Sequence, residues 1–81
     1  MSQKNAKTLR RASIYLALMR VTECEQEEGK RMPQRSKVVS ALSDKIYKSL
    51  KARVARSSHK EQGEVLSKLR RIVELGNRAA A

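Results

Sequence analysis

The stretch VARSSHKE, residues 54–61, decides between two helical folds for this chain. Ser58 followed three residues later by Glu61 is a capping-box pattern, which is typical of the start of a helix. We therefore predict a break near Ser57 and Ser58 that separates two helices. Without this break, the residues on both sides would form one rod of about forty residues, which needs a coiled-coil partner to bury its apolar stripe.

Apolar residues at intervals of three or four positions lie on both sides of the break, as one buried helix face requires. Before it they are Val39, Leu42, Ile46, Leu50 and Val54, and after it they are Val65, Leu66, Leu69, Ile72 and Val73. Ser36 predicts the N-cap of a helix over 36–56, after a turn that contains Pro33. Gly76 and Asn77 predict a left-handed stop for a helix over 59–75, which leaves 77–81 as a flexible end.

A further helix is predicted over 7–28, because Gly29 supplies a stop and residues 1–6 are polar enough to form a flexible end. Its apolar side chains surround the helix axis, which is typical of a helix buried on several sides. Two short neighbouring helices cannot cover such a helix completely. We therefore expect another copy of the chain or a partner to cover the rest. A homodimer through this helix is the leading interpretation, with Ile14, Leu18 and Val21 in the interface.

The composition predicts an all-α fold, a three-helix bundle in one small domain over 1–81. Apolar residues make up 40% of the chain, with no Phe, no Trp and two Tyr, which suits packed helices better than a sheet. Three Gly and one Pro leave few of the turn residues that closely spaced strands require. A chain of this length removes only about 60% of its unfolded surface from water, so its core is thin.

The net charge of +11 indicates an anionic partner, because such an excess of one sign is typical of proteins that bind nucleic acid or acidic surfaces. Residues 30–56 carry nine Lys and Arg against one Asp. Cations along one side of a helix can follow a row of phosphates and release counterions. The candidate binding residues are Arg35, Lys37, Lys45, Lys48, Lys51 and Arg56, together with the adjacent pairs Arg10 and Arg11, and Arg70 and Arg71.

Two functions remain open for this basic surface. The first is a regulatory protein that binds nucleic acid, DNA or RNA, or a nucleoprotein through the phosphate backbone. The alternative is an adaptor or inhibitor that binds an acidic protein, as small basic accessory proteins of phages and mobile elements do. An apolar patch beside a cationic rim would favour the alternative, because phosphate binding needs no such patch. A third alternative is a purely structural oligomer, in which the charged face only keeps the protein soluble. A membrane surface is disfavoured because the helix over 36–56 lacks bulky aromatic anchors.

The acidic cluster of Glu23, Glu25, Glu27 and Glu28 is unusual, because negative charge at a helix C-terminus opposes the helix dipole. We expect these carboxylates to pair with Lys30, Arg31 or the basic helix that follows, which would orient the two helices. A cation site or a docking patch for a basic partner is the alternative, but the run lacks the alternating ligands and tight turn of a cation loop.

No residue pattern predicts catalysis, a metal, a cofactor or a small-molecule substrate, so we expect a protein that is not an enzyme. Cys24 and His59 each occur once, and we expect Cys24 to be a small buried residue and His59 to be exposed in the first turn of its helix. A single cysteine suits a reducing compartment, which predicts the cytoplasm. The apolar runs are too short for a membrane span.

Overall fold

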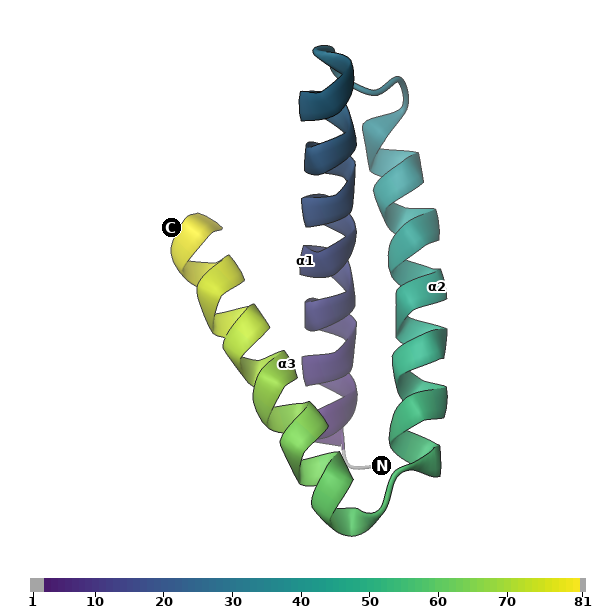
Figure 1. Cartoon of the computed structure of the whole chain (residues 1–81), viewed down its shortest axis with the longest axis vertical. Coiled ribbons are helices and arrows are strands. Elements are labelled where there is room, and N and C mark those ends of the chain that lie inside the picture. The colour runs from purple at the N-terminus through teal and green to yellow at the C-terminus, as the bar shows by residue number, and fades with distance from the viewer. Residues whose placement is uncertain (1–2, 81) are drawn as a thin grey trace.

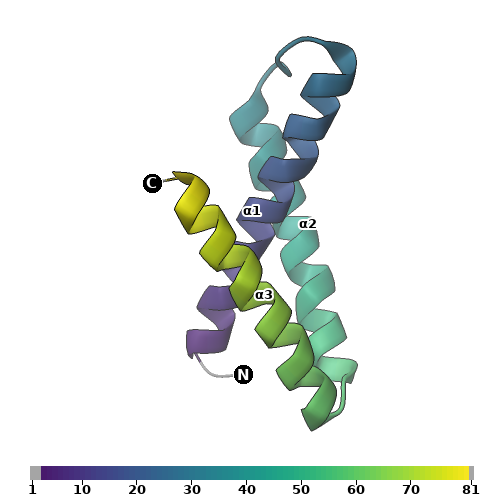
Figure 2. The same cartoon turned by 60° about the vertical axis from the view of Figure 1, so that its left-hand side comes forward.

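Three α-helices form the part of the chain that the computed structural model describes, residues 3–80. They are α1 (Gln3–Glu28), α2 (Arg35–Arg56) and α3 (His59–Ala80). α1 and α2 lie antiparallel and side by side, whereas α3 crosses α1 obliquely and its C-terminal half diverges from it (Figures 1 and 2). The predicted all-α three-helix bundle is confirmed, and residues 3–80 contain no strand.

The core lies at the end of the molecule where all three helices meet. Its buried residues are Leu9 and Ala12 of α1, Val54 of α2 and Leu69 of α3. Half-buried apolar residues pack around this cluster, among them Tyr47 and several members of the two predicted stripes. Burial of apolar side chains therefore holds the three helices together mainly at this end, since such burial is the dominant favourable contribution to folding.

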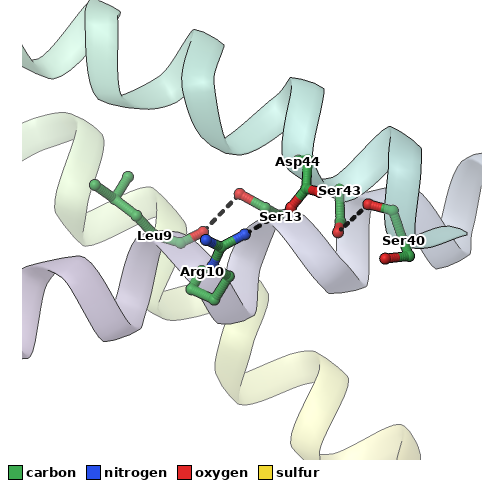
Figure 3. A network of polar contacts seen from close by, with 6 residues as sticks. All are labelled: Leu9, Arg10, Ser13, Ser40, Ser43 and Asp44. Carbon is green, nitrogen blue, oxygen red and sulfur yellow. Dashed lines mark hydrogen bonds and ion pairs between the residues drawn. The ribbon is translucent and has the colours of Figure 1, made fainter.

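Small residues let α1 and α2 approach each other closely. Ala12, Ser13 and Ala17 of α1 are fully buried, and Ser43 of α2 is almost so. Each buried hydroxyl donates to a carbonyl of its own helix, Ser13 Oγ to Leu9 O at 2.7 Å and Ser43 Oγ to Ser40 O at 3.0 Å (Figure 3). The interface therefore contains polar side chains whose hydrogen bonds are satisfied locally.

The predicted break between α2 and α3 is confirmed, which excludes the single rod. Ser57 has an extended backbone, and the Oγ atom of Ser58 accepts a hydrogen bond from the backbone N–H of Glu61 at 3.3 Å. Gln62 closes the corner, because its Nε2 atom donates to the carbonyl of Val54 at 2.8 Å and so supplies a partner to the end of α2. The side chain of Gln62 therefore ties the first turn of α3 to the last turn of α2.

The other end of α2 differs from the prediction. Gly29 has the expected left-handed backbone, with φ at 72°, and ends α1. Ser36, however, is not the N-cap of α2, because the helix already begins at Arg35 and Gln34 occupies the cap position with φ at 53°. Contacts of Glu25 with this loop, described below, hold the chain at Arg35 and so place the start of α2 before Ser36.

The outer ends of α1 and α3 also extend beyond their predicted limits. α1 already includes residues 3–6, where Asn5 and Ala6 are half-buried and Arg70 of α3 donates a long hydrogen bond of 3.5 Å to Asn5 Oδ1. α3 continues through Gly76 and Asn77 to Ala80, so the predicted stop at Gly76 was wrong. The predicted flexible ends over 1–6 and 77–81 are thus helical at 3–6 and 77–80, while 1–2 and 81 lie outside the described residues.

Tyr15 explains why Gly76 stands inside α3. A Cβ atom at Gly76 would lie 2.6 Å from the ring of Tyr15, so only glycine leaves room for this ring. The hydroxyl of Tyr15 also donates to Oδ1 of Asn77 at 2.6 Å. A pair of residues that is typical of a helix end therefore serves as one of the contacts between α3 and α1.

Candidate nucleic-acid interface

The outer side of α2 carries most of the predicted binding residues. Lys37, Lys45, Lys48, Lys51 and Arg56 are all exposed, as is Arg53, which the sequence analysis did not select. Lys37 and Lys48 are eleven residues apart, and so are Lys45 and Arg56. Because eleven residues make about three helical turns, each pair lies in line along the helix. We call these six residues the α2 cationic face, within which Lys51 and Arg53 point to opposite flanks because residues two positions apart lie about 200° apart around the axis.

The only acid of α2, Asp44, is neutralised from α1. Arg10 Nη1 lies 2.9 Å from Asp44 Oδ1 (Figure 3). The guanidinium carbon of Arg10 also lies 4.1 Å from the centre of the Tyr47 ring. Arg10, predicted to bind a partner, therefore also holds α1 against α2. Within the described residues, the six members of the α2 cationic face take part in no ion pair, so their charge is uncompensated.

Arg35 is engaged inside the chain, by Glu25. Its Nε atom lies 3.1 Å from Glu25 Oε1, and its Nη2 atom donates to Thr22 Oγ1 at 3.3 Å. The second carboxylate oxygen of Glu25 accepts the backbone N–H of Met32 at 2.8 Å. The Met32 N–H and then Arg35 hold the pKa of Glu25 below its ordinary value, because both stabilise the carboxylate.

This pairing confirms, for Glu25, that the acidic cluster pairs with the start of the basic helix. Glu23, Glu27 and Glu28 are exposed. No group of three or more potential metal ligands occurs among residues 3–80.

The two arginine pairs occupy different surroundings from the α2 cationic face. Arg11 is exposed on α1, while Arg70 and Arg71 border a shallow hollow of about 440 Å³ on α3. Arg78 borders the same hollow and pairs with Glu74 at 2.9 Å. α3 and α2 lie on opposite sides of α1 in Figure 1 and touch little beyond their corner, so the α3 arginines are separate from the α2 cationic face.

Cys24 and His59 do not form a joint site. Both are exposed, so the prediction that Cys24 is buried was wrong, whereas the predicted exposure of His59 is confirmed. The last turns of α1, which hold Cys24, extend past the end of α3 and lack cover on that side (Figure 1). His59 begins α3 at the opposite end of the molecule.

The expected dimer interface is only partly accessible. Val21 is 2% exposed and belongs to the interior of the chain, so it is not available to a second copy. It points into the interior because Leu9, Ser13, Ala17 and Val21 follow one another at intervals of four along the buried side of α1. Ile14 is 38% exposed and Leu18 is half-buried. The homodimer itself stays a prediction.

No helix of residues 3–80 combines the length and apolar character that crossing a membrane requires. Comparison of the chain with protein-family models, with curated proteins and with solved structures gave no match in any of the three.

Proposed function

We propose that this chain is a non-enzymatic regulatory protein that binds nucleic acid, contacting the phosphate backbone through the α2 cationic face. One observation carries the proposal: six exposed cations line a single helix whose only acid is already paired with Arg10. Bringing uncompensated cations together raises the free energy of the free protein, and a row of phosphates relieves that repulsion.

The dimensions of α2 suit a nucleic-acid backbone. Its 22 residues extend over about 33 Å, close to the length of one turn of duplex DNA. Contacts of this kind recognise charge and shape and carry no base sequence by themselves. The proposal therefore includes DNA and RNA alike, with affinity dominated by counterion release.

A cytoplasmic location belongs to the proposal as well, since a free exposed thiol at Cys24 suits a reducing compartment.

The test is fluorescence anisotropy of nuclease-treated protein with labelled duplex DNA, single-stranded DNA and RNA at increasing salt. With six phosphate contacts, affinity should fall about a thousandfold between roughly 50 and 200 mM salt. Replacing Lys45, Lys48 and Lys51 by Glu should weaken binding strongly. The slope of log affinity against log salt concentration should also fall by the share of about three phosphate contacts.

A matched control keeps the same net charge as this triple variant. Lys4, Lys7 and Lys60 are exposed lysines of α1 and α3, and their replacement by Glu removes equal charge from other surfaces. Binding by the control should stay well above that of the α2 variant. Equal losses in the two variants, or none in the α2 variant, would show that α2 is not the interface.

A further inference from the structure

A groove of about 690 Å³ lies between α1 and α3, where the C-terminal half of α3 diverges (Figures 1 and 2). Its walls are largely apolar, with Leu18 and Met19 on α1 facing Ile72, Leu75 and Ala79 on α3. Met19 is 56% exposed and Leu75 is 54% exposed, the two most exposed large apolar residues of the described chain. Apolar residues grouped in this way mark surfaces that bind partners.

The groove is formed before any partner arrives, because contacts within the chain hold its two walls together. The ring of Tyr15 lies against Gly76, and the Tyr15 hydroxyl donates to Asn77. The lining residues extend from 15 to 23 on α1 and from 72 to 79 on α3. At 1.5 Å per residue each wall is about two helical turns long, roughly 10 to 12 Å.

This length matches the apolar stripe of an amphipathic helix, whose anchors at i, i+3, i+4 and i+7 also occupy two turns. Small-molecule sites bury most of their ligand in an enclosed pocket. Here Met19 and Leu75, at the two edges of the groove, are more than half exposed, so the shape suits an elongated partner that lies along the groove.

Arginines outnumber acids beside the groove. Leu75 also borders the hollow of α3 that contains Arg70, Arg71 and the ion pair of Arg78 with Glu74. Arg11 precedes Leu18 by seven residues, which places it on the same face of α1. Glu23 is the acidic residue of the lining. Since the whole chain carries +11, two copies repel each other, whereas an acidic partner is attracted.

We propose that this groove binds an amphipathic helix of another protein, with acidic side chains beside its apolar stripe. The apolar stripe contacts Leu18, Met19 and Leu75, and its carboxylates lie near Arg71 and compete with Glu74 for Arg78. The site is separate from the α2 cationic face, so it adds a protein partner to the nucleic-acid partner proposed above.

The probe for this site is a labelled synthetic helix of about 18 residues, with Leu at i, i+3, i+4 and i+7 and Glu at the flanking positions. Two control peptides are used, one with the same residues in scrambled order and one with Lys in place of every Glu. Binding is measured by fluorescence anisotropy at near-physiological salt. The acidic amphipathic peptide should bind at least about tenfold more tightly than either control.

Variants locate the binding in the groove. Leu75→Glu and Met19→Glu should each weaken peptide binding by about tenfold or more, because each places a negative charge on an apolar edge of the groove. Ala52→Glu, at an exposed position of α2, changes the net charge equally and should have little effect on the peptide. Since Leu75 and Met19 are exposed, both variants should remain folded, which circular dichroism checks.

Three results would overturn this proposal. One is that the acidic amphipathic and scrambled peptides bind equally well, or that neither binds. Another is a loss with Ala52→Glu as large as that with Leu75→Glu. The third is a micromolar homodimer in sedimentation that Leu75→Glu dissociates, because the groove would then hold a second copy. Nucleic-acid binding should persist in Leu75→Glu, so the two proposals succeed or fail separately.

Discussion

The two ends of α1 lie in very different surroundings. At the N-terminal end, Leu9 is fully buried and packs in one cluster with Val54 of α2 and Leu69 of α3. Toward the other end α3 diverges from α1, and Met19 is 56% exposed. One helix that is apolar on all sides therefore serves two purposes. Where three helices meet it builds the core, and where α3 diverges it leaves the exposed apolar groove for which we propose a partner.

The largest effect on stability is expected from a comparison of two leucines of α3, one buried and one exposed. Leu69 is 4% exposed and Leu75 is 54% exposed. Leu69→Ala should lower the free energy of unfolding by about 2 to 5 kcal/mol, because it leaves a cavity in the only place where all three helices pack. Urea denaturation followed by circular dichroism measures this loss.

Leu75→Ala is the matched control and should cost less than about 1 kcal/mol, since the side chain is already half in water. In a domain this small, each 1 kcal/mol corresponds to a change in Tm of about 4 to 8 °C. Similar losses in the two variants would mean that the C-terminal half of α3 is as tightly packed as the core, which would contradict the comparison.

Two glycines of α3 provide the next test. A Cβ at Gly63 meets no atom within 4 Å, so Gly63→Ala should stabilise the protein by about 0.5 to 1 kcal/mol through helix propensity. Gly76→Ala adds the same propensity but collides with the Tyr15 ring, at a cost of about 1 to 3 kcal/mol. Its net effect should therefore be destabilising. If both variants stabilise the protein equally, Tyr15 does not pack against Gly76.

The smallest effect is expected at the loop between α1 and α2, where an ion pair takes the place of apolar packing. The pKa of Glu25 is lowered from its ordinary value of 4.5, first by the N–H of Met32 and then by Arg35. A lowered pKa in the folded state means that the stabilisation is fully present above pH 4.5 and is lost as the pH falls through the folded value.

Glu25→Gln keeps the side chain's shape and removes its charge. Its deficit in unfolding free energy relative to the unaltered protein should be constant from about pH 6 to 7 and should shrink below pH 4.5. Glu27→Gln, which removes an exposed carboxylate without these contacts, is the control. A deficit that does not change with pH would show that charge at Glu25 does not hold the loop.

Much of the fold could be predicted from short-range patterns in the sequence. Gly29 and the Ser58 cap act within one helical turn, so the sequence locates both ends that they control. The stripes before and after the break correctly indicated which residues face α1, as Val54 and Leu69 show. The exposure of the α2 lysines followed from the same helical spacing.

The two errors at helix boundaries have a common physical cause, which is contact between residues far apart in the chain. Ser36 has the chemistry of a cap, but Glu25 holds Arg35 ten residues later and moves the helix start. Gly76 and Asn77 have the chemistry of a helix end, but Tyr15 packs on them from sixty residues away and the helix continues. Local propensities are worth at most about 1 kcal/mol per residue, so packing overrides them.

The sequence by itself determined three helices, their apolar faces and a strongly basic second helix, because these depend on spacing and charge along one element. Only the tertiary structure decided which charges remain uncompensated and where α1 is left uncovered. Arg10 and Arg35 are paired inside the chain while Lys45, Lys48 and Lys51 are not. The groove beside Leu75 exists because α3 leaves the corner at Ser57 and Ser58 on a diverging course, a direction that no single helix encodes.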